Sequence, residues 1–192
     1  YWRAFYKEKL AISYSPLGVI RDDASFLDGL KFQGITAPRL IQDTYCLVRG
    51  KRRKISYRAF ERTATFLNPK GDVLQIVIRA QDDGVAFRYR FLKSDHKLRT
   101  ILKELTGFEL PKGAKVWAHP YDRVSLYTPA YETYWRQAMP AGTSSPRREG
   151  WAFPLLFATS EEDLWGLISE ADLDESYCGC HLEQRCDHGL YR

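Results

Sequence analysis

Two runs of alternating apolar residues, joined by a polar turn, constrain the fold of this chain more than any other feature. In residues 73–79 and again in residues 85–91, apolar side chains recur at every second position, which is the period of a β-strand. The turn between them, residues 80–84, ends in Asp83-Gly84. An Asp-Gly pair tolerates positive φ and suits a tight connection between antiparallel strands. The sequence therefore predicts a β-hairpin at residues 73–91.

Further short strands are predicted along the rest of the chain, with turn signals between them and little helical periodicity. They cover residues 1–6, 10–14, 40–49, 55–67, 116–120, 151–159, 164–170 and 175–182. Residues 98–108 could be helical by composition, and residues 21–38 are predicted to be a loop with at most one short strand. An aromatic content of 14% also favours β structure. A chain of 192 residues can bury a proper core. The pattern predicts two packed antiparallel sheets in one domain, residues 1–192.

Charge and hydropathy argue against two classes of partner. The net charge is +5, but the basic residues are scattered except in residues 49–54. A solvated hairpin tip explains that run better than nucleic-acid binding, although a basic interaction module stays a third and weaker alternative. No run approaches the roughly 20 apolar residues that span a bilayer, so no membrane span is predicted.

The four cysteines carry little functional signal. They are Cys46, Cys178, Cys180 and Cys186. No Cys-x-x-Cys pair is present among them, so the zinc signal is weak and free thiols are the favoured interpretation.

The predicted hairpin also resembles a known family. The string Arg79-Ala80-x-Asp82-Asp83-Gly84-Val85-Ala86-Phe87-Arg88-Tyr89 is similar to the signature of the N-terminal domain of glycoside hydrolase family 97. Shorter similarities fall in the family order: Ser15-Pro16-Leu17-Gly18, Glu104-x-Thr106-x-Phe108, and Ile168-x-Glu170-Ala171-x-Leu173. The second of these implies an extended strand over residues 98–108 in place of a helix. The resemblance implies an all-β, antiparallel β-sandwich of the galactose-mutarotase-like (supersandwich) type. It also implies a non-catalytic N-terminal module of a calcium-dependent α-glucosidase or α-galactosidase.

Glu170 is the metal ligand that the resemblance implies. In the family, the matching glutamate reaches the active site of a neighbouring catalytic (β/α)8 domain of the same polypeptide and helps to hold calcium there. Calcium takes roughly 6–8 oxygen ligands, so one glutamate cannot form such a site alone. Glycoside hydrolysis needs two suitably spaced carboxyl groups, and no acid pair of this chain lies in a family motif for that work. We therefore expect no catalytic residue here and no hydrolase activity from this chain alone.

The resemblance also implies the setting in which the protein works. The expected partners are the catalytic domain and an oligo- or polysaccharide substrate. The family is mostly bacterial and exported, which implies a periplasmic or secreted protein even though the chain begins without a recognisable signal peptide.

Two further sets of residues are candidates for structural or binding roles. In the hairpin, Arg79, Asp82, Asp83, Gly84 and Arg88 match the family motif best, and a network of paired Arg–Asp hydrogen bonds is expected to hold the turn. Among the aromatic residues, Trp117, Tyr131 and Trp135 are candidates for stacking on sugar, although filling a core or a domain interface is the favoured interpretation. The alternative function that this set leaves open is a stand-alone carbohydrate-binding β-sandwich that uses the aromatic loop 121–150.

Overall fold

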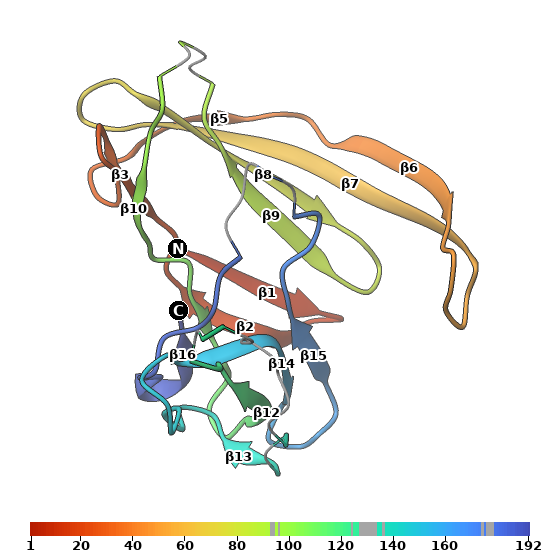
Figure 1. Cartoon of the computed structure of the whole chain (residues 1–192). Helices are drawn as coiled ribbons and strands as arrows, with labels where there is room; N and C mark the ends of the chain where they lie inside the picture. The colour runs from red at the N-terminus through yellow and green to blue at the C-terminus, as the bar shows by residue number, and fades with distance from the viewer. Residues whose placement is uncertain are drawn as a thin grey trace. The chain divides into compact units, whose positions relative to one another are not determined.

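A computed structural model describes residues 1–92, 95, 97–123, 125–126, 134–135, 137–173, 175 and 179–192. The chain divides into two compact units, one formed by Tyr1–Leu17 with Leu105–Arg192 and the other by Gly18–Glu104. Every pair of strands in the described residues is antiparallel (Figure 1). The predicted all-β, antiparallel fold class is therefore confirmed. The described part of the chain contains no helix with the length and hydropathy needed to cross a membrane.

The unit Gly18–Glu104 contains a five-stranded sheet around one long strand. Its strands are β5 (Lys31–Ile35), β6 (Arg39–Cys46), β7 (Lys54–Leu67), β8 (Val73–Ala80) and β9 (Val85–Arg90). The long strand β7 pairs with β8 along one edge, and along its other edge with β6 and then β5. The predicted succession of strands from residue 40 to residue 91 is confirmed.

The predicted β8–β9 hairpin is confirmed, and its turn does not use the positive φ that an Asp-Gly pair tolerates. Ala80 and Val85 form its last pair, and the N–H of Gln81 donates to the carbonyl of Gly84 at 2.8 Å. No residue of this four-residue loop has a positive φ. Four-residue hairpin loops are most often built around a type I turn, which does not need one.

Three short strands lie in segments where the sequence predicted mostly loop. β3 (Val19–Arg21) pairs with β4 (Ser25–Phe26) on one side and with β10 (Ile101–Glu104) on the other. Strands of two or three residues are too short to show an alternating pattern, which is why β3 and β4 escaped prediction. The five residues of β5, which include Gly34, lie in the segment that was predicted to be mostly loop. The buried side chains of Phe26 and Leu74 belong to the core of this unit.

The other unit contains three sheets. The largest, in spatial order, consists of β13 (Met139–Pro140), β12 (Lys115–Pro120), β14 (Trp151–Ala158) and β15 (Trp165–Ile168). Two smaller sheets pair β1 (Trp2–Tyr6) with β2 (Lys9–Ser15) and β11 (Phe108–Glu109) with β16 (Leu190–Tyr191). The chain reaches β16 through a short 3-10 helix, η1 (Asp187–Gly189).

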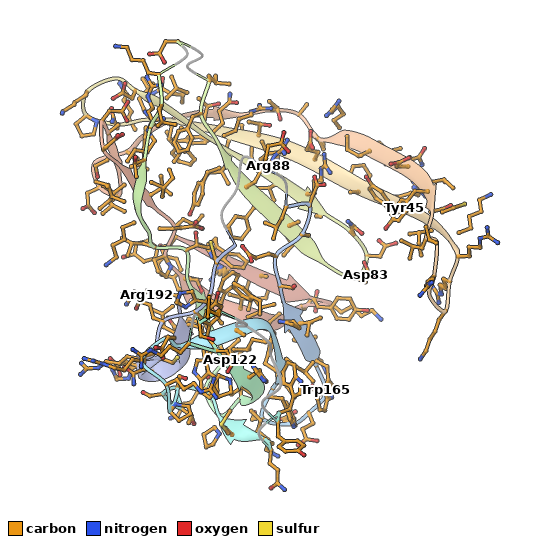
Figure 2. The ribbon with its side chains drawn as sticks, viewed as in Figure 1. Tyr45, Asp83, Arg88, Asp122, Trp165 and Arg192 are labelled. Atoms are coloured by element: carbon orange, nitrogen blue, oxygen red, sulfur yellow. The ribbon has the colours of Figure 1, made fainter. Side chains whose placement is uncertain are left out.

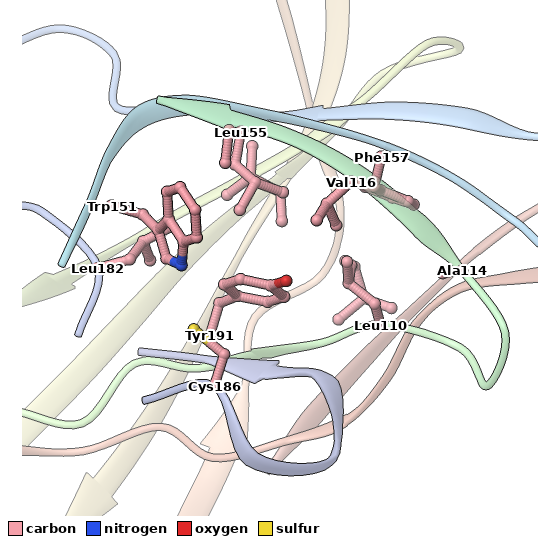
Figure 3. Packing of buried hydrophobic residues seen from close by; sticks show 12 residues of the cluster. Leu110, Ala114, Val116, Trp151, Leu155, Phe157, Leu182, Cys186 and Tyr191 are labelled. Carbon is pink, nitrogen blue, oxygen red and sulfur yellow. The ribbon is translucent and has the colours of Figure 1, made fainter. Parts of the chain in front are cut away.

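One face of the large sheet forms the core of this unit. Val116 and Leu155 from the sheet pack with Trp151, Tyr191 and Cys186, all with side chains almost fully buried (Figure 3). Gly150 makes this packing possible, because it has a φ of +92° and an added Cβ would lie 1.8 Å from the carbonyl oxygen of Leu182. The core therefore fixes β14 and, through it, the hairpin that leads to Glu170.

The predicted strand over residues 175–182 is not present in the part of it that the structure describes. Residues 174 and 176–178 lie outside the described residues. Residues 179–181 are not in a strand, and Leu182 makes a single bridge with Trp151.

Candidate functional site

The β14–β15 hairpin determines where Glu170 lies. Its two strands pair without a register shift, from Leu155 opposite Ile168 to Ala158 opposite Trp165. The N–H of Thr159 donates a hydrogen bond to the carbonyl of Leu164 and closes the turn. The sequence predicted that the second strand includes Glu170, but β15 ends at Ile168. Glu170 therefore lies two residues beyond the strand, on the segment that follows the hairpin.

The carboxylate of Glu170 is oriented by one backbone group. Both of its oxygens accept a hydrogen bond from the N–H of Cys180, at 3.1 and 3.2 Å. The residue is half-buried. An ionised carboxylate offers about four lone-pair sites, so a single shared N–H leaves acceptor capacity for a further ligand.

Glu170 does not belong to a complete metal site within the described residues. No group of three or more His, Cys, Asp or Glu side chains in this part of the chain is placed to hold a metal ion. A carboxylate oxygen suits calcium, but calcium takes roughly 6–8 oxygen ligands. By its chemistry, the Glu170 carboxylate could supply one calcium ligand, and it could not form a calcium site alone.

Trp117 and Trp165 form a stacked pair on the large sheet. Their ring centroids are 4.9 Å apart and the rings are inclined by 26°. The indole N–H of Trp165 donates to the carbonyl of Glu162 at 3.2 Å, and the residue, labelled in Figure 2, is 51% exposed. Trp165 was not singled out from the sequence, since its position beside Trp117 depends on the pairing of strands that are far apart in the chain.

The three predicted sugar-stacking residues do not share one described cluster. Trp117 stacks on Trp165, whereas Trp135 lies against His119 with ring centroids 5.7 Å apart. Tyr131 lies outside the described residues. Trp135 is 53% exposed and its neighbour Tyr134 is 93% exposed, so both offer ring surface to a ligand.

The ionic network of the hairpin motif uses a different acid from the one predicted. Arg79 donates through Nε to Glu61 Oε2 at 2.7 Å, and Arg39 donates to Glu61 Oε1 at 2.6 Å. These three residues are direct neighbours across β6, β7 and β8. Hydrogen bonds from Arg39 and then Arg79 hold the pKa of Glu61 below its usual value.

The two aspartates of the turn lie apart from this network. Asp82 and Asp83 are exposed, and within the described residues neither makes an ion pair. Figure 2 shows Asp83 at the tip of the hairpin and Arg88 further along β9, where Arg88 pairs in register with Val77. The predicted pairing of arginine with the turn aspartates is therefore wrong. Arg79 on β8 pairs instead with Glu61, which lies directly opposite it on β7.

Comparison with known proteins decides the family. Residues 1–191 match the family model described as glycosyl-hydrolase 97 N-terminal. The chain belongs to this family. As a family 97 N-terminal domain, it is 32% identical over 178 residues to a probable retaining alpha-galactosidase of Streptomyces bingchenggensis (strain BCW-1), a match that covers 93% of this chain and 26% of the relative.

Solved structures with the same fold include two other glycosidases. A beta-arabinopyranosidase is 31% identical, with a TM-score of 0.88 over 97% of this family 97 domain and 30% of that chain. A family 97 enzyme from Pseudoalteromonas sp. strain K8, solved with panose and with acarbose, is 24% identical, with a TM-score of 0.79 over 99% of this chain and 28% of that one. These similarities confirm the predicted β-sandwich fold. This chain spans less than a third of each relative's length.

Proposed function

We propose that this family 97 domain packs on a catalytic (β/α)8 domain of the same polypeptide and supplies Glu170 as one ligand of a calcium ion in the active site. The observation that carries this proposal is the position of the Glu170 carboxylate. It follows a hairpin that the core holds in place, it is oriented by the Cys180 N–H, and it belongs to no group of three or more potential metal-ligating side chains in the described chain. Such a group is suited to complete a site that another domain supplies.

The contribution of this chain to the chemistry is to hold and orient one oxygen donor. A bound calcium ion would supply fixed positive charge that orients sugar hydroxyls and stabilises negative charge as it develops on oxygen. The β14–β15 hairpin limits the freedom of Glu170, and the Cys180 N–H fixes the plane of its carboxylate. The two carboxyl groups that glycoside cleavage requires belong, in this proposal, to the catalytic domain.

The substrate class follows from the relatives above 30% identity. One is named as an alpha-galactosidase and the other as a beta-arabinopyranosidase. We therefore propose that the complete enzyme cleaves galactosides or arabinopyranosides, and that it acts outside the cytoplasm, in the periplasm or after secretion.

Chromogenic substrates test this proposal on the full polypeptide that includes this chain. Nitrophenyl α-galactoside, β-arabinopyranoside and α-glucoside are compared, with calcium present and after chelation. We expect hydrolysis of one of the first two, its loss on chelation, and its recovery with calcium but not with magnesium, which demands a tighter octahedral geometry. Hydrolysis that a chelator leaves unchanged would contradict the calcium proposal, and turnover by residues 1–192 alone would contradict the non-catalytic role.

A carbohydrate-binding function through the loop 121–150 is the second candidate. The exposed rings of Tyr134 and Trp135 favour it, because exposed aromatic faces stack on sugars. Titration of residues 1–192 with galacto- and malto-oligosaccharides tests it. Binding that Trp135→Ala abolishes would support this function, and no binding at millimolar sugar would exclude it.

A further inference from the structure

The outer face of the large sheet carries four large apolar side chains that its core does not use. We call this set the tryptophan face; it consists of Trp117, Leu156, Trp165 and Leu167. Trp117 is opposite Leu156 and Leu156 is opposite Leu167, while Trp165 is two residues from Leu167 and on the same side of β15. The alternate residues Val116, Leu155, Phe157 and Ile168 are buried in the core. Trp165 is 51% exposed and Leu167 is 62% exposed.

We propose that the tryptophan face is the surface through which this domain packs on the catalytic domain. The inference rests on the proposed function, since it names the contact surface of that same partner. Tryptophan is enriched in the buried centres of protein interfaces, and contiguous exposed apolar patches commonly mark such surfaces.

The geometry of Trp165 fits a docking anchor. The ring stacks on Trp117, and its N–H already donates to the Glu162 carbonyl, so the surface that remains exposed is apolar. A side chain that is held in place before binding loses little conformational entropy when a partner covers it.

The surroundings of Trp165 suit a protein partner better than a sugar. Sugar sites combine an aromatic ring with polar groups that bind hydroxyls. Here the nearby polar side chains, Lys115 and Glu162, form an ion pair with each other at 2.7 Å. The remaining neighbours on the face, Leu156 and Leu167, are aliphatic, so among the described residues the face has no ready set of free hydrogen-bonding groups.

The position of Glu170 connects this face to the catalytic domain. Leu167 and Glu170 are three residues apart, and three extended residues span at most about 10 Å. If Glu170 reaches a calcium ion in the catalytic domain, Leu167 must lie close to that domain as well. In addition, β15 is the last strand of its sheet, and proteins commonly cover such edges. The relatives contain ample chain to do so, because this domain matches only 26% to 30% of their length.

Hydroxyl-radical footprinting of the wild-type protein tests the proposal. Oxidation of Trp165 and Leu167 is measured in residues 1–192 and in the full polypeptide. We expect oxidation of Trp165 to fall about fivefold in the full polypeptide, as a half-exposed ring becomes an interface residue. Leu40 and Phe60, an exposed cross-strand pair on β6 and β7 at 44% and 55% exposure, serve as the matched comparison and should keep their rates. Equal oxidation of Trp165 in both proteins would overturn the proposal.

A pair of double variants in the full polypeptide gives an independent readout. Trp165→Ser with Leu167→Ser should split a single thermal transition into two, whereas Leu40→Ser with Phe60→Ser should not. Trp165→Phe should retain the single transition. If hydrolysis by the full polypeptide depends on calcium but Trp165 is oxidised as fast as in residues 1–192, the tryptophan face is not the docking surface, and the proposed function still holds. A full polypeptide without calcium-dependent hydrolysis would refute the proposed function, and the footprint would still report whether the face is covered.

Discussion

Among single residues, Glu61 shows how this sheet balances its charge. It accepts hydrogen bonds from Arg39 and Arg79, which are its direct neighbours on β6 and β8. Both bonds favour the ionised carboxylate, so the pKa of Glu61 is lowered from its usual value of 4.5. A lowered pKa contributes stability that is fully present above that usual value and is lost as pH falls through the lower folded value.

Glu61→Gln tests this account. At pH 7 the variant should be less stable by about 1 kcal/mol or less, since Arg39 is 71% exposed and water screens its charge. The difference in the free energy of unfolding should shrink as pH falls below 4.5. Chemical denaturation at pH 7 and at pH 3.5 measures it, with Glu162→Gln as the exposed control. A difference that stays constant over this pH range would contradict the assignment.

Cys186 illustrates how burial controls the reactivity of a thiol. Burial in the core raises its pKa to about 12, with a smaller opposing effect from Trp151. Cys46 is exposed. In the folded protein at pH 8, iodoacetamide should modify Cys46 and leave Cys186 unmodified, because the thiolate is the reactive form. Peptide mass spectrometry checks this, and denaturation in urea should abolish the difference. Comparable modification of both cysteines in the native protein would show that this core opens readily.

At the scale of elements, two glycines with similar sequence signals have different structural roles. Gly84 ends the β8–β9 turn without a positive φ, and no atom lies within 4 Å of an added Cβ. Gly150 precedes β14, has a φ of +92°, and approaches the carbonyl of Leu182 closely. The cost of a side chain at each position therefore differs.

Gly84→Ala and Gly150→Ala form a matched pair of variants. Gly84→Ala should change the free energy of unfolding by no more than about 0.5 kcal/mol. Gly150→Ala should cost about 2 kcal/mol or more, because it strains the backbone and breaks the Trp151–Leu182 bridge. Thermal and urea unfolding compare the two. Equal losses of stability would mean that the turn of β8–β9 is more constrained than its open surroundings indicate.

The elements that the sequence predicted well are those with a long alternating pattern. The β8–β9 hairpin and the long strand β7 are of this kind. The short strands β3 and β4 contain too few residues for such a pattern. The partner of Arg79 was missed for a related reason, since only the register between β7 and β8 shows that Glu61 faces it. Glu170 is a candidate only through the resemblance to a family motif, because no local pattern distinguishes it from other acids near strand ends.

At the scale of the whole molecule, two compact units each bury their own apolar cluster. Glu170 and the tryptophan face belong to the same unit, Tyr1–Leu17 with Leu105–Arg192. Family membership extends over residues 1–191 and thus includes both units. The described residues contain no group of three or more His, Cys, Asp or Glu side chains placed to hold a metal ion, so the proposed calcium site depends on a second domain.

Calorimetric titration of the full polypeptide with calcium tests this central claim most directly. The wild type is compared with Glu170→Gln, and with Glu161→Gln as a control carboxylate in the turn of the same hairpin. We predict that Glu170→Gln weakens calcium binding at least about tenfold, since affinity depends on the charge and number of oxygen ligands. The Glu161→Gln variant should bind as the wild type does. Unchanged calcium affinity in Glu170→Gln would contradict the claim that this domain lends a ligand to the active site.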